Sequence, residues 1–377
     1  MKKLALLLLT GTFVFTAANA KIRRVGFFGS PISGTDYITF AAAYADAASG
    51  DTILMFPATT LSATISKKLI IIGPGNWLDP NDSPAKGNAN LQAFAGIATV
   101  NNITFDPGSD GSVLTGFYGA NIGIRDNNIT IARNREILIY VTYNPTPTTI
   151  TNLQVLQNYR VSIQQYYNNG SGSTNMNISN NLIAAFSTAV GNTYSGNISN
   201  NVWAYDATLN TNNVNGGDPS FSGTNGINLG AGAYLLQNNI FLSYTNAVVA
   251  SNYNYFIFSN GGNSVFNYNL GVQSSTPINW GGGTGNVITS ISNAASVFAA
   301  FPTIGTTSAD ARYQLKAGSP ALTVGAGSTP IGMFAGVTPY KLSTIPSIPT
   351  IYSLSSPQGN NPSGNTIQIN VSTRGNN

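Results

Sequence analysis

An apolar residue followed three positions later by asparagine recurs along the middle of the chain, among short strand-like stretches. Ile131 precedes Asn134 in this way, and the asparagine then recurs at steps of 24, 23, 20, 38 and 30 residues. Stretches such as NITI, NLQV and YLLQ are short and alternating or β-branched, which predicts strands rather than helices. A period of about 20 to 30 residues is typical of a solenoid. The asparagines that carry this period are Asn134, Asn158, Asn181, Asn201, Asn239 and Asn269.

This pattern predicts an all-β fold, a single right-handed parallel β-helix whose coils stack at the strand spacing of about 4.8 Å. Asparagine at one fixed corner tolerates the left-handed backbone of a sharp turn, and its amide can bond to the amide of the next coil. We therefore expect the six asparagines to form a structural ladder. The alternative is a repetitive glycan-binding or ice-binding face, although the regular Thr-x-Thr ranks that ice binding needs do not occur.

The two ends of the chain depart from this pattern. Thr35 and Asp36 favour a helix N-cap and Gly50 favours a helix stop, so we expect a short helix that caps the first coil. Near the other end, three prolines predict an extended segment, and two strand-like stretches flank the turn-rich PQGNNPSGN, which predicts a hairpin. The expected organisation is a β-helix with its N-terminal cap over residues 21–338, then a Pro-rich extended segment and a C-terminal hairpin over residues 339–377.

The start of the chain has the pattern of an export signal. Lys2 and Lys3 precede a short apolar run, and Ala-Asn-Ala at positions 18–20 is a small-x-small cleavage signal. We expect residues 1–20 to be a signal peptide that is cleaved after Ala20, and the protein to be secreted or held at the cell surface. No later stretch reaches the ~18 apolar residues of a transmembrane helix, so none is expected.

Composition narrows the chemistry. Only 7% of residues are charged, against about 25% in typical proteins. The formal charge of +4 falls to +2 once Lys2 and Lys3 are removed, and no Lys and Arg cluster points to a nucleic-acid partner. Histidine and cysteine are absent, which excludes a Ser-His-Asp triad, a cysteine nucleophile and an ordinary zinc site. No cofactor is expected.

Two segments resemble a known group of folds. AAAYADAASGDTILMFPAT with ISKKLIIIGPG is similar to the opening of right-handed β-helix proteins of the pectate-lyase-like superfold, and YQLKAGSPALTVGAG with IGMFAG resembles their closing segment. The resemblance covers roughly residues 35 to 340. It implies the fold and no particular reaction, because this superfold includes lyases, hydrolases, esterases, phage tailspikes and adhesins.

A catalytic site has few candidates. The resemblance implies an Arg or Lys base for a lyase, or paired aspartates for a hydrolase, yet residues 137–309 contain only three charged side chains. The candidates are Arg125 and Asp126, stacked near Arg160 of the next coil, as a small basic groove for an acidic sugar. The alternatives are a solvated ion-pair patch, where each pair contributes about 0–1 kcal/mol, and a binding role.

Two acidic turns could hold Ca²⁺, since carboxylates and turn carbonyls are the oxygens that it prefers. FDPGSDGS contains Asp106 and Asp110, and LDPNDS contains Asp79 and Asp82. Neither has the spacing of a calcium loop, and Asp also begins turns by bonding to its own backbone. We therefore expect no metal site, with Ca²⁺ as the open alternative.

Neutral sugars are bound by aromatic faces with amide and hydroxyl partners, and the chain is rich in all three. The alternative is that the rings stack inside the coils or cover a sheet. The candidate sugar-binding residues are Tyr166, Tyr167, Trp203, Tyr205, Tyr244 and Trp280.

The sequence as a whole favours a secreted or cell-surface β-helix protein that is non-catalytic and contacts glycans or other cell-surface material. One alternative is a polysaccharide lyase or glycoside hydrolase that acts on an extracellular polysaccharide. Another is a purely architectural surface protein. The expected partner is an extracellular polysaccharide or a cell-surface glycan, and no oligomeric state is predicted.

Overall fold

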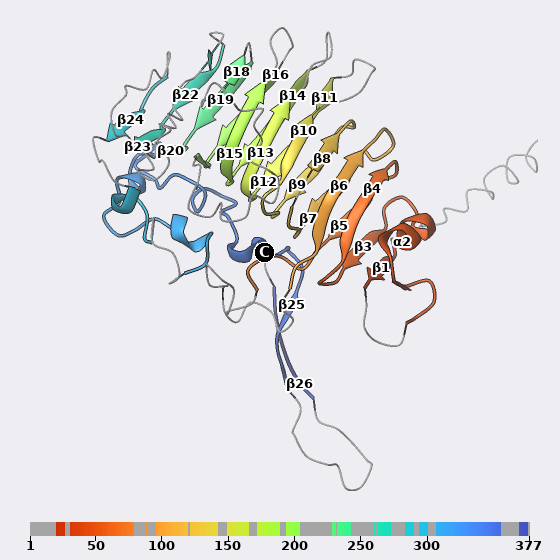
Figure 1. Ribbon diagram of the computed structural model, residues 1–377. Coiled ribbons are helices and arrows are strands. Elements are labelled where there is room, and N and C mark those ends of the chain that lie inside the picture. Colours follow the sequence, from red (N-terminus) through yellow and green to blue (C-terminus); the bar gives the residue numbers. More distant parts are fainter. Residues whose placement is uncertain are drawn as a thin grey trace, which may run out of the picture.

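The computed structural model of the chain is mostly β, with two large parallel sheets and few helices (Figure 1). It describes residues 20–26, 31–78, 88, 96–119, 121–141, 149–165, 172–188, 194–203, 228–230, 232–242, 259–260, 263–272, 283–289, 294–300, 307–355 and 369–375. From β3 to β17, the strands alternate along the chain between the two sheets, which we name sheet A and sheet B, apart from β11 and β12, which both belong to sheet A. The arrangement is compatible with a parallel β-helix.

All strand pairs in the two sheets are parallel among the described residues. In spatial order, sheet A contains β2 (Asp36–Tyr37), β1 (Ile22–Val25), β3 (Thr52–Met55), β5 (Ile70–Ile72), β7 (Val113–Thr115), β9 (Thr130–Ala132), β12 (Gln154–Leu156), β14 (Ser173–Ser179), β16 (Tyr194–Ser199), β19 (Ala233–Gln237) and β22 (Val265–Asn267), with β11 (Ile150–Thr151) beside β14. Sheet B contains β24 (Val287–Thr289), β23 (Leu270–Val272), β20 (Ile240–Leu242), β17 (Val202–Trp203), β15 (Leu182–Thr188), β13 (Tyr159–Gln165), β10 (Leu138–Val141), β8 (Asn121–Ile124), β6 (Thr99–Phe105) and β4 (Thr60–Ile65), with β18 (Asn228–Gly230) beside β15 and β21 (Ser259–Asn260) beside β18.

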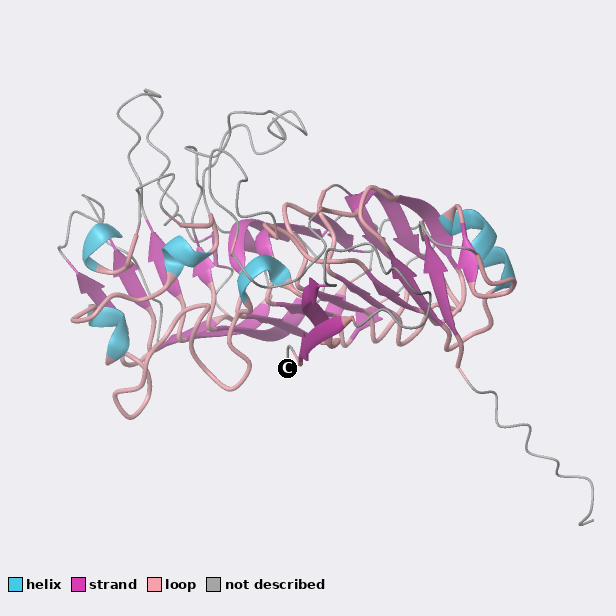
Figure 2. Cartoon of the chain, turned by 90° about the horizontal axis from the view of Figure 1, so that it is seen from below, coloured by secondary structure: helices cyan, strands magenta, loops and turns pink. Residues whose placement is uncertain are grey.

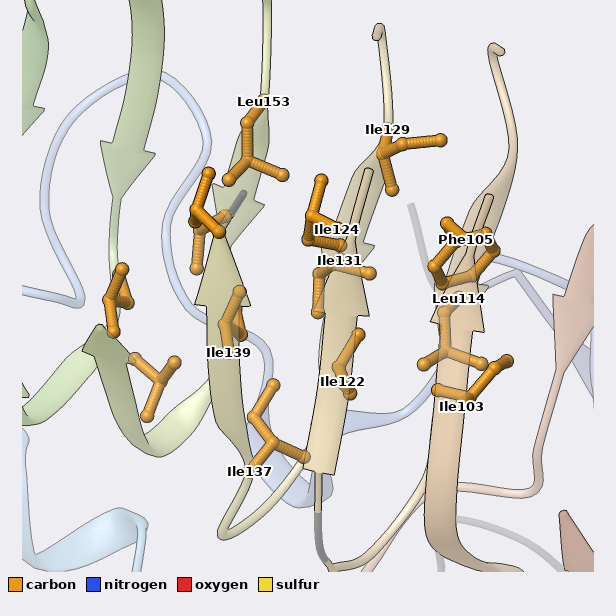
Figure 3. Packing of buried hydrophobic residues seen from close by; sticks show 14 of the residues in the cluster. Ile103, Phe105, Leu114, Ile122, Ile124, Ile129, Ile131, Ile137, Ile139 and Leu153 are labelled. Carbon is orange, nitrogen blue, oxygen red and sulfur yellow. The ribbon is translucent and has the colours of Figure 1, made fainter. Parts of the chain in front are cut away.

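The core lies between the sheets and follows from strand alternation, since every second side chain points to the same face. Ile103, Ile122 and Ile139 occupy one register position of β6, β8 and β10, and each is fully buried. Figure 3 shows these isoleucines beside Leu114 and Ile131 of sheet A. Each such side chain contributes about 1.5–3 kcal/mol by leaving water, so the repeated apolar row stabilises the stack of coils.

A short helix, α2 (Phe40–Asp46), lies at the β1 end of the sheets (Figure 1). Its N-cap is Thr39, whose hydroxyl accepts a hydrogen bond from the amide of Ala42. The expected caps Thr35 and Asp36 are therefore wrong, because Asp36 begins β2 and its carboxylate accepts from Arg24. A role of α2 as a cap on the first coil stays a prediction.

After the last strand of sheet B, the chain turns back along the coils as residues 307–349, which we call the return segment. Figure 2 shows it lying across the strands with its short helices. Gln157, between β12 and β13, donates to the carbonyls of Thr338 and Pro339 at 2.9 and 2.8 Å. Arg133, between β9 and β10, donates to the carbonyl of Ile345 at 3.0 Å. The 3-10 helices beyond β24 are η3 (Ala294–Ser296), η4 (Ala311–Tyr313), η5 (Pro320–Leu322) and η6 (Leu342–Thr344).

The return segment covers an apolar row on the outside of sheet B. This row joins Ile331, Met333 and Tyr340 of the return segment in a second buried cluster, separate from the core between the sheets. The described strands of sheet B end at Thr289, whereas coils were expected as far as residue 338. The outward residues of the row are Tyr159, Leu182, Val202, Ile240 and Leu270.

The return segment leads into an antiparallel hairpin, β25 (Thr350–Ser355) and β26 (Asn370–Arg374). A hairpin between these stretches was predicted from the turn-rich sequence that separates them. It projects from the body of the molecule (Figure 1), and Ile351, Tyr352 and Leu354 on it are exposed.

Candidate functional site

The six asparagines singled out in the sequence lie in one buried row, and none has exposed surface. The Nδ2 of Asn134 donates to the Oδ1 of Asn158 at 3.2 Å, and each later member donates to the next at 3.0 Å, as far as Asn269. Each Oδ1 from Asn158 onward also accepts the backbone amide of the preceding member. These side chains are used within the protein and are not available to a partner.

The row continues one coil further than the sequence pattern indicated. Asn269 donates to the Oδ1 of Asn286 at 2.9 Å, and Asn286 donates to the carbonyl of Phe266 at 2.7 Å. Three positions before Asn286 the chain has Gly283, where the other members of the row have an apolar residue. The apolar-x-x-Asn pattern therefore missed Asn286.

The expected left-handed backbone belongs to the residue before each asparagine and not to the ladder residue itself, which corrects the reason given for asparagine at this corner. The preceding residues include arginine, glutamine and tyrosine, so the amide is selected by its stacking bonds and not by its backbone. These residues have φ between 53° and 58° and are Arg133, Gln157, Asn180, Asn200, Asn238 and Tyr268.

The three catalytic candidates are not brought together. Arg125 follows the end of β8 and pairs with Asp106 at 3.1 Å, while Asp126 accepts the amide of Gly108 at 2.8 Å. Arg160 lies at the beginning of β13 and pairs with Glu136 at 3.5 Å. Asn121 of β8 and Ser162 of β13 both pair with Leu138 of β10, so they occupy one register position. Arg125 and Arg160 lie on opposite sides of this position, about six residues or ~20 Å apart along the strands. The prediction that Arg125, Asp126 and Arg160 form one basic groove is therefore wrong.

The acidic turns give no metal cluster in the part of the chain that is described, where no group of three or more Asp or Glu side chains converges. Asp106 is paired with Arg125, and Asp110 accepts a hydrogen bond from Asn128 at 2.9 Å. The other two candidates, Asp79 and Asp82, lie outside the described residues.

Of the aromatic candidates, only Trp203 falls within the described residues, and its prediction as a sugar platform is wrong. Its side chain is 1% exposed and stacks on Phe241 at 5.5 Å, with Phe186 edge-on at 6.2 Å. Its ring therefore belongs to the core, where it cannot meet a sugar. The other five candidates, Tyr166, Tyr167, Tyr205, Tyr244 and Trp280, lie outside the described residues.

A cluster of charged and aromatic side chains lies where β8, β10 and β13 begin, and we call it the Arg135 cluster. The guanidinium of Arg135 lies 4.4 Å from the ring centre of Trp77 and 4.8 Å from that of Tyr118. The carboxylate of Glu136 is 3.2 Å from Arg135 and 3.5 Å from Arg160. The three charged side chains are 16–25% exposed, so a ligand can reach them while the rings and pairs hold them in place.

Strand register explains how the Arg135 cluster forms. Tyr118, Arg135 and Tyr159 occupy one bridged position on three successive coils, so Tyr118 and Arg135 meet across the stack. Burial, followed by the charge of Glu136, raises the pKa of the Tyr118 hydroxyl above its ordinary value. The tyrosine therefore stays neutral at physiological pH and can act as a hydrogen-bond donor. Arg135 and Glu136 are adjacent in the charged stretch IRDNNITIARNREI, but Trp77 is 58 residues before Arg135 and gave no local signal.

Next to this cluster, the outward residues of sheet B form an uncharged surface, which we call the outer face. Two register rows cross β4, β6, β8, β10, β13 and β15, and most of their members carry a hydroxyl or an amide. Tyr140 is the aromatic residue among them and is partly exposed. One row is Ser62, Asn102, Asn121, Leu138, Ser162 and Ala185, and the other is Thr64, Thr104, Gly123, Tyr140, Gln164 and Ser187, of which Gln164 is buried.

No family model, no curated protein and no solved structure matches the chain. Among the described residues, no helix is both long and apolar enough to span a membrane. The fold and the chemistry of its surface are therefore the basis for a functional proposal.

Proposed function

We propose that the chain is an exported, non-catalytic protein that binds polysaccharide along the outer face of sheet B. We also infer one right-handed parallel β-helix, because crossovers between parallel strands are right-handed in about 98% of cases. Its opening and closing segments resemble those of the pectate-lyase-like superfold. The observation that carries the proposal is the outer face itself: rows of uncharged hydroxyl and amide side chains around the ring of Tyr140. Sugars are held by such polar groups together with an aromatic surface.

The geometry of the outer face supports a chain-like ligand better than a small molecule. Its rows repeat at the strand spacing of about 4.8 Å, so hydroxyl and amide groups recur on most of the stacked strands. The Arg135 cluster stands at the edge of the face with two guanidinium groups against one carboxylate. Its net positive charge favours a polysaccharide that carries carboxylate or sulfate groups.

Catalysis is not part of the proposal. Hydrolysis of a glycoside needs two carboxylates in partnership, and the Arg135 cluster contains one, Glu136, which both arginines already engage. The position of Arg125, about 20 Å from Arg160, gives a lyase no assembled basic groove.

Glycan-array binding of the purified protein, together with an absorbance assay for unsaturated products on acidic polysaccharides, tests the proposal. We expect binding without product. Tyr140→Ala should weaken binding about tenfold, or about 1.4 kcal/mol, and Arg160→Ala should weaken binding of acidic glycans only. Tyr352→Ala is the matched control, because this tyrosine is exposed on the distant hairpin. Equal binding by Tyr140→Ala and Tyr352→Ala would contradict the proposal. Product formation that Arg125→Ala abolishes would instead support a lyase.

A further inference from the structure

The backbone nitrogen of Lys21, directly after the predicted cleavage point, is held by a buried carboxylate. Lys21 N donates to the Oδ1 of Asp51 at 2.8 Å, and the carbonyl of Lys21 accepts the amide of Thr52 at 2.8 Å. Lys21 therefore enters β1 in a fixed position beside β3, while Ala20 and Lys21 are themselves exposed. The peptide bond between them is accessible from solvent, and the atom that cleavage would release already has its partner.

Asp51 is an unusual partner because it is charged and only 2% exposed. Its Oδ2 accepts from the Nε of Arg23 at 3.0 Å and from the amide of Ala48 at 2.9 Å. Burial alone raises the pKa of the Asp51 carboxyl, but hydrogen bonds from Lys21, Ala48 and Arg23 outweigh burial and hold the pKa below its usual range. The carboxylate therefore stays ionised, and a buried charge of this kind requires a compensating charge.

The charge that compensates Asp51 is shared. Arg23 is 3% exposed, and its guanidinium also bonds to the carboxylate of Asp46 and to the hydroxyl of Tyr37. One buried guanidinium thus serves two carboxylates. The hydrogen bond from Tyr37, followed by the charges of Arg23 and Lys21, holds the pKa of the Asp46 carboxyl below its usual range. A second positive charge at the Lys21 nitrogen would complete the balance at Asp51.

We propose that cleavage after Ala20 creates an ion pair between the new α-ammonium group of Lys21 and the buried carboxylate of Asp51. This pair holds β1 against β3 in the mature protein. The proposal rests on the signal-peptide prediction and is independent of the proposed polysaccharide binding.

The chemistry is a peptide-bond hydrolysis by a peptidase that cuts after small residues. The bond from the carbonyl carbon of Ala20 to the nitrogen of Lys21 breaks, and water supplies the hydroxyl group to Ala20 and a proton to Lys21. The amine then takes up a further proton from solvent. A neutral amide that donates to Asp51 becomes a cation that pairs with it, which strengthens the same contact.

The experiment compares a chain that begins at Lys21 with one that keeps Ala20, so that the amine is moved one residue away from Asp51. The readout is the hydrogen-exchange protection of the Thr52 amide, which reports the opening of β1 from β3. We expect about tenfold greater protection at pH 7 in the chain that begins at Lys21. In Asp51→Asn versions of both chains, the two protections should be equal.

The pH dependence gives a second test that needs no substitution. An α-amino group has an ordinary pKa of about 7.7–8.0, and pairing with Asp51 should raise it in the folded chain. The added protection should therefore be complete below pH 7.7 and should disappear as pH rises through the raised pKa. Equal protection of the two chains at pH 7, a difference that pH does not change, or an exported protein whose mass places its first residue elsewhere would overturn the proposal.

Discussion

Replacement of Asn181 by alanine tests whether the buried asparagine row holds the coils together. Among the described residues, the Asn181 side chain makes five hydrogen bonds. Its Oδ1 accepts the amide and the Nδ2 of Asn158 at 2.8 and 3.0 Å. Its Nδ2 donates to the carbonyls of Val155 and Ser179 and to the Oδ1 of Asn201, at 2.8 to 3.0 Å. The substitution removes all five from a site with no exposed surface.

The magnitude depends on which groups lose their partner. The backbone amide of Asn158 is left buried without Asn181 as acceptor, which costs about 1–3 kcal/mol. The carbonyl of Ser179 keeps the amide of Gln157 as a donor, so its loss is smaller. With the remaining bonds at about 0.5–1.5 kcal/mol each, we expect Asn181→Ala to lower the free energy of unfolding by about 3–5 kcal/mol. Asn181→Asp should cost more, because it places a buried carboxylate against three acceptors.

The assay is urea denaturation followed by circular dichroism, with Asn152→Gly as the control. Asn152 has φ 59°, and its Nδ2 donates to the Oδ1 of Asn128 at 2.8 Å in a second, exposed row of amides. Glycine accepts this left-handed backbone without strain, so its substitution should change stability by no more than about 1 kcal/mol. If Asn181→Ala costs no more than Asn152→Gly, the row is not what stabilises the coils.

Two further predictions concern the return segment. Gly332 and Gly327 both have left-handed backbones, but a Cβ on Gly332 would lie 2.6 Å from Ile240 whereas one on Gly327 meets nothing within 4 Å. Gly332→Ala should therefore lower the free energy of unfolding by about 1–3 kcal/mol more than Gly327→Ala in urea denaturation, and equal losses would show that the segment does not pack on sheet B. Burial, followed by the charge of Asp310, raises the pKa of Tyr340 well above 10.0. Because the folded chain keeps this proton longer than the unfolded chain, stability should fall above pH 10 by about 1.4 kcal/mol per unit, and Tyr340→Phe should remove that part of the slope in unfolding measured between pH 9 and 11. An unchanged slope would place Tyr340 in solvent.

The asparagine row was accessible from the sequence because its spacing is local. Each coil repeats an apolar residue and an asparagine three positions apart, and the amides can meet only if the coils stack in register. The position of Asn286 was not accessible, since glycine replaces the apolar residue before it. The face of the sheet on which Trp203 lies could not be predicted either, because β17 contains two residues and alternation over two positions does not define a face.

The candidate site was only partly predictable. Arg135 and Glu136 are neighbours in the sequence, but Arg160 lies at an irregular register position of β13, next to Tyr159, where it pairs with Glu136. Counting along the sequence therefore placed Arg160 beside Arg125, about 20 Å from its position along the strands. Trp77 reaches Arg135 from a distant part of the chain.

The sequence by itself determined the mostly β structure, the asparagine row and the hairpin. All of these depend on residues that are close in the chain or repeat at one step. Only the tertiary structure decided that residues 307–349 run back along the coils, because contacts such as Gln157 with Pro339 join residues 182 positions apart. The apolar row at Leu182 and Val202 lies on the outer side of sheet B, and only that return makes it buried.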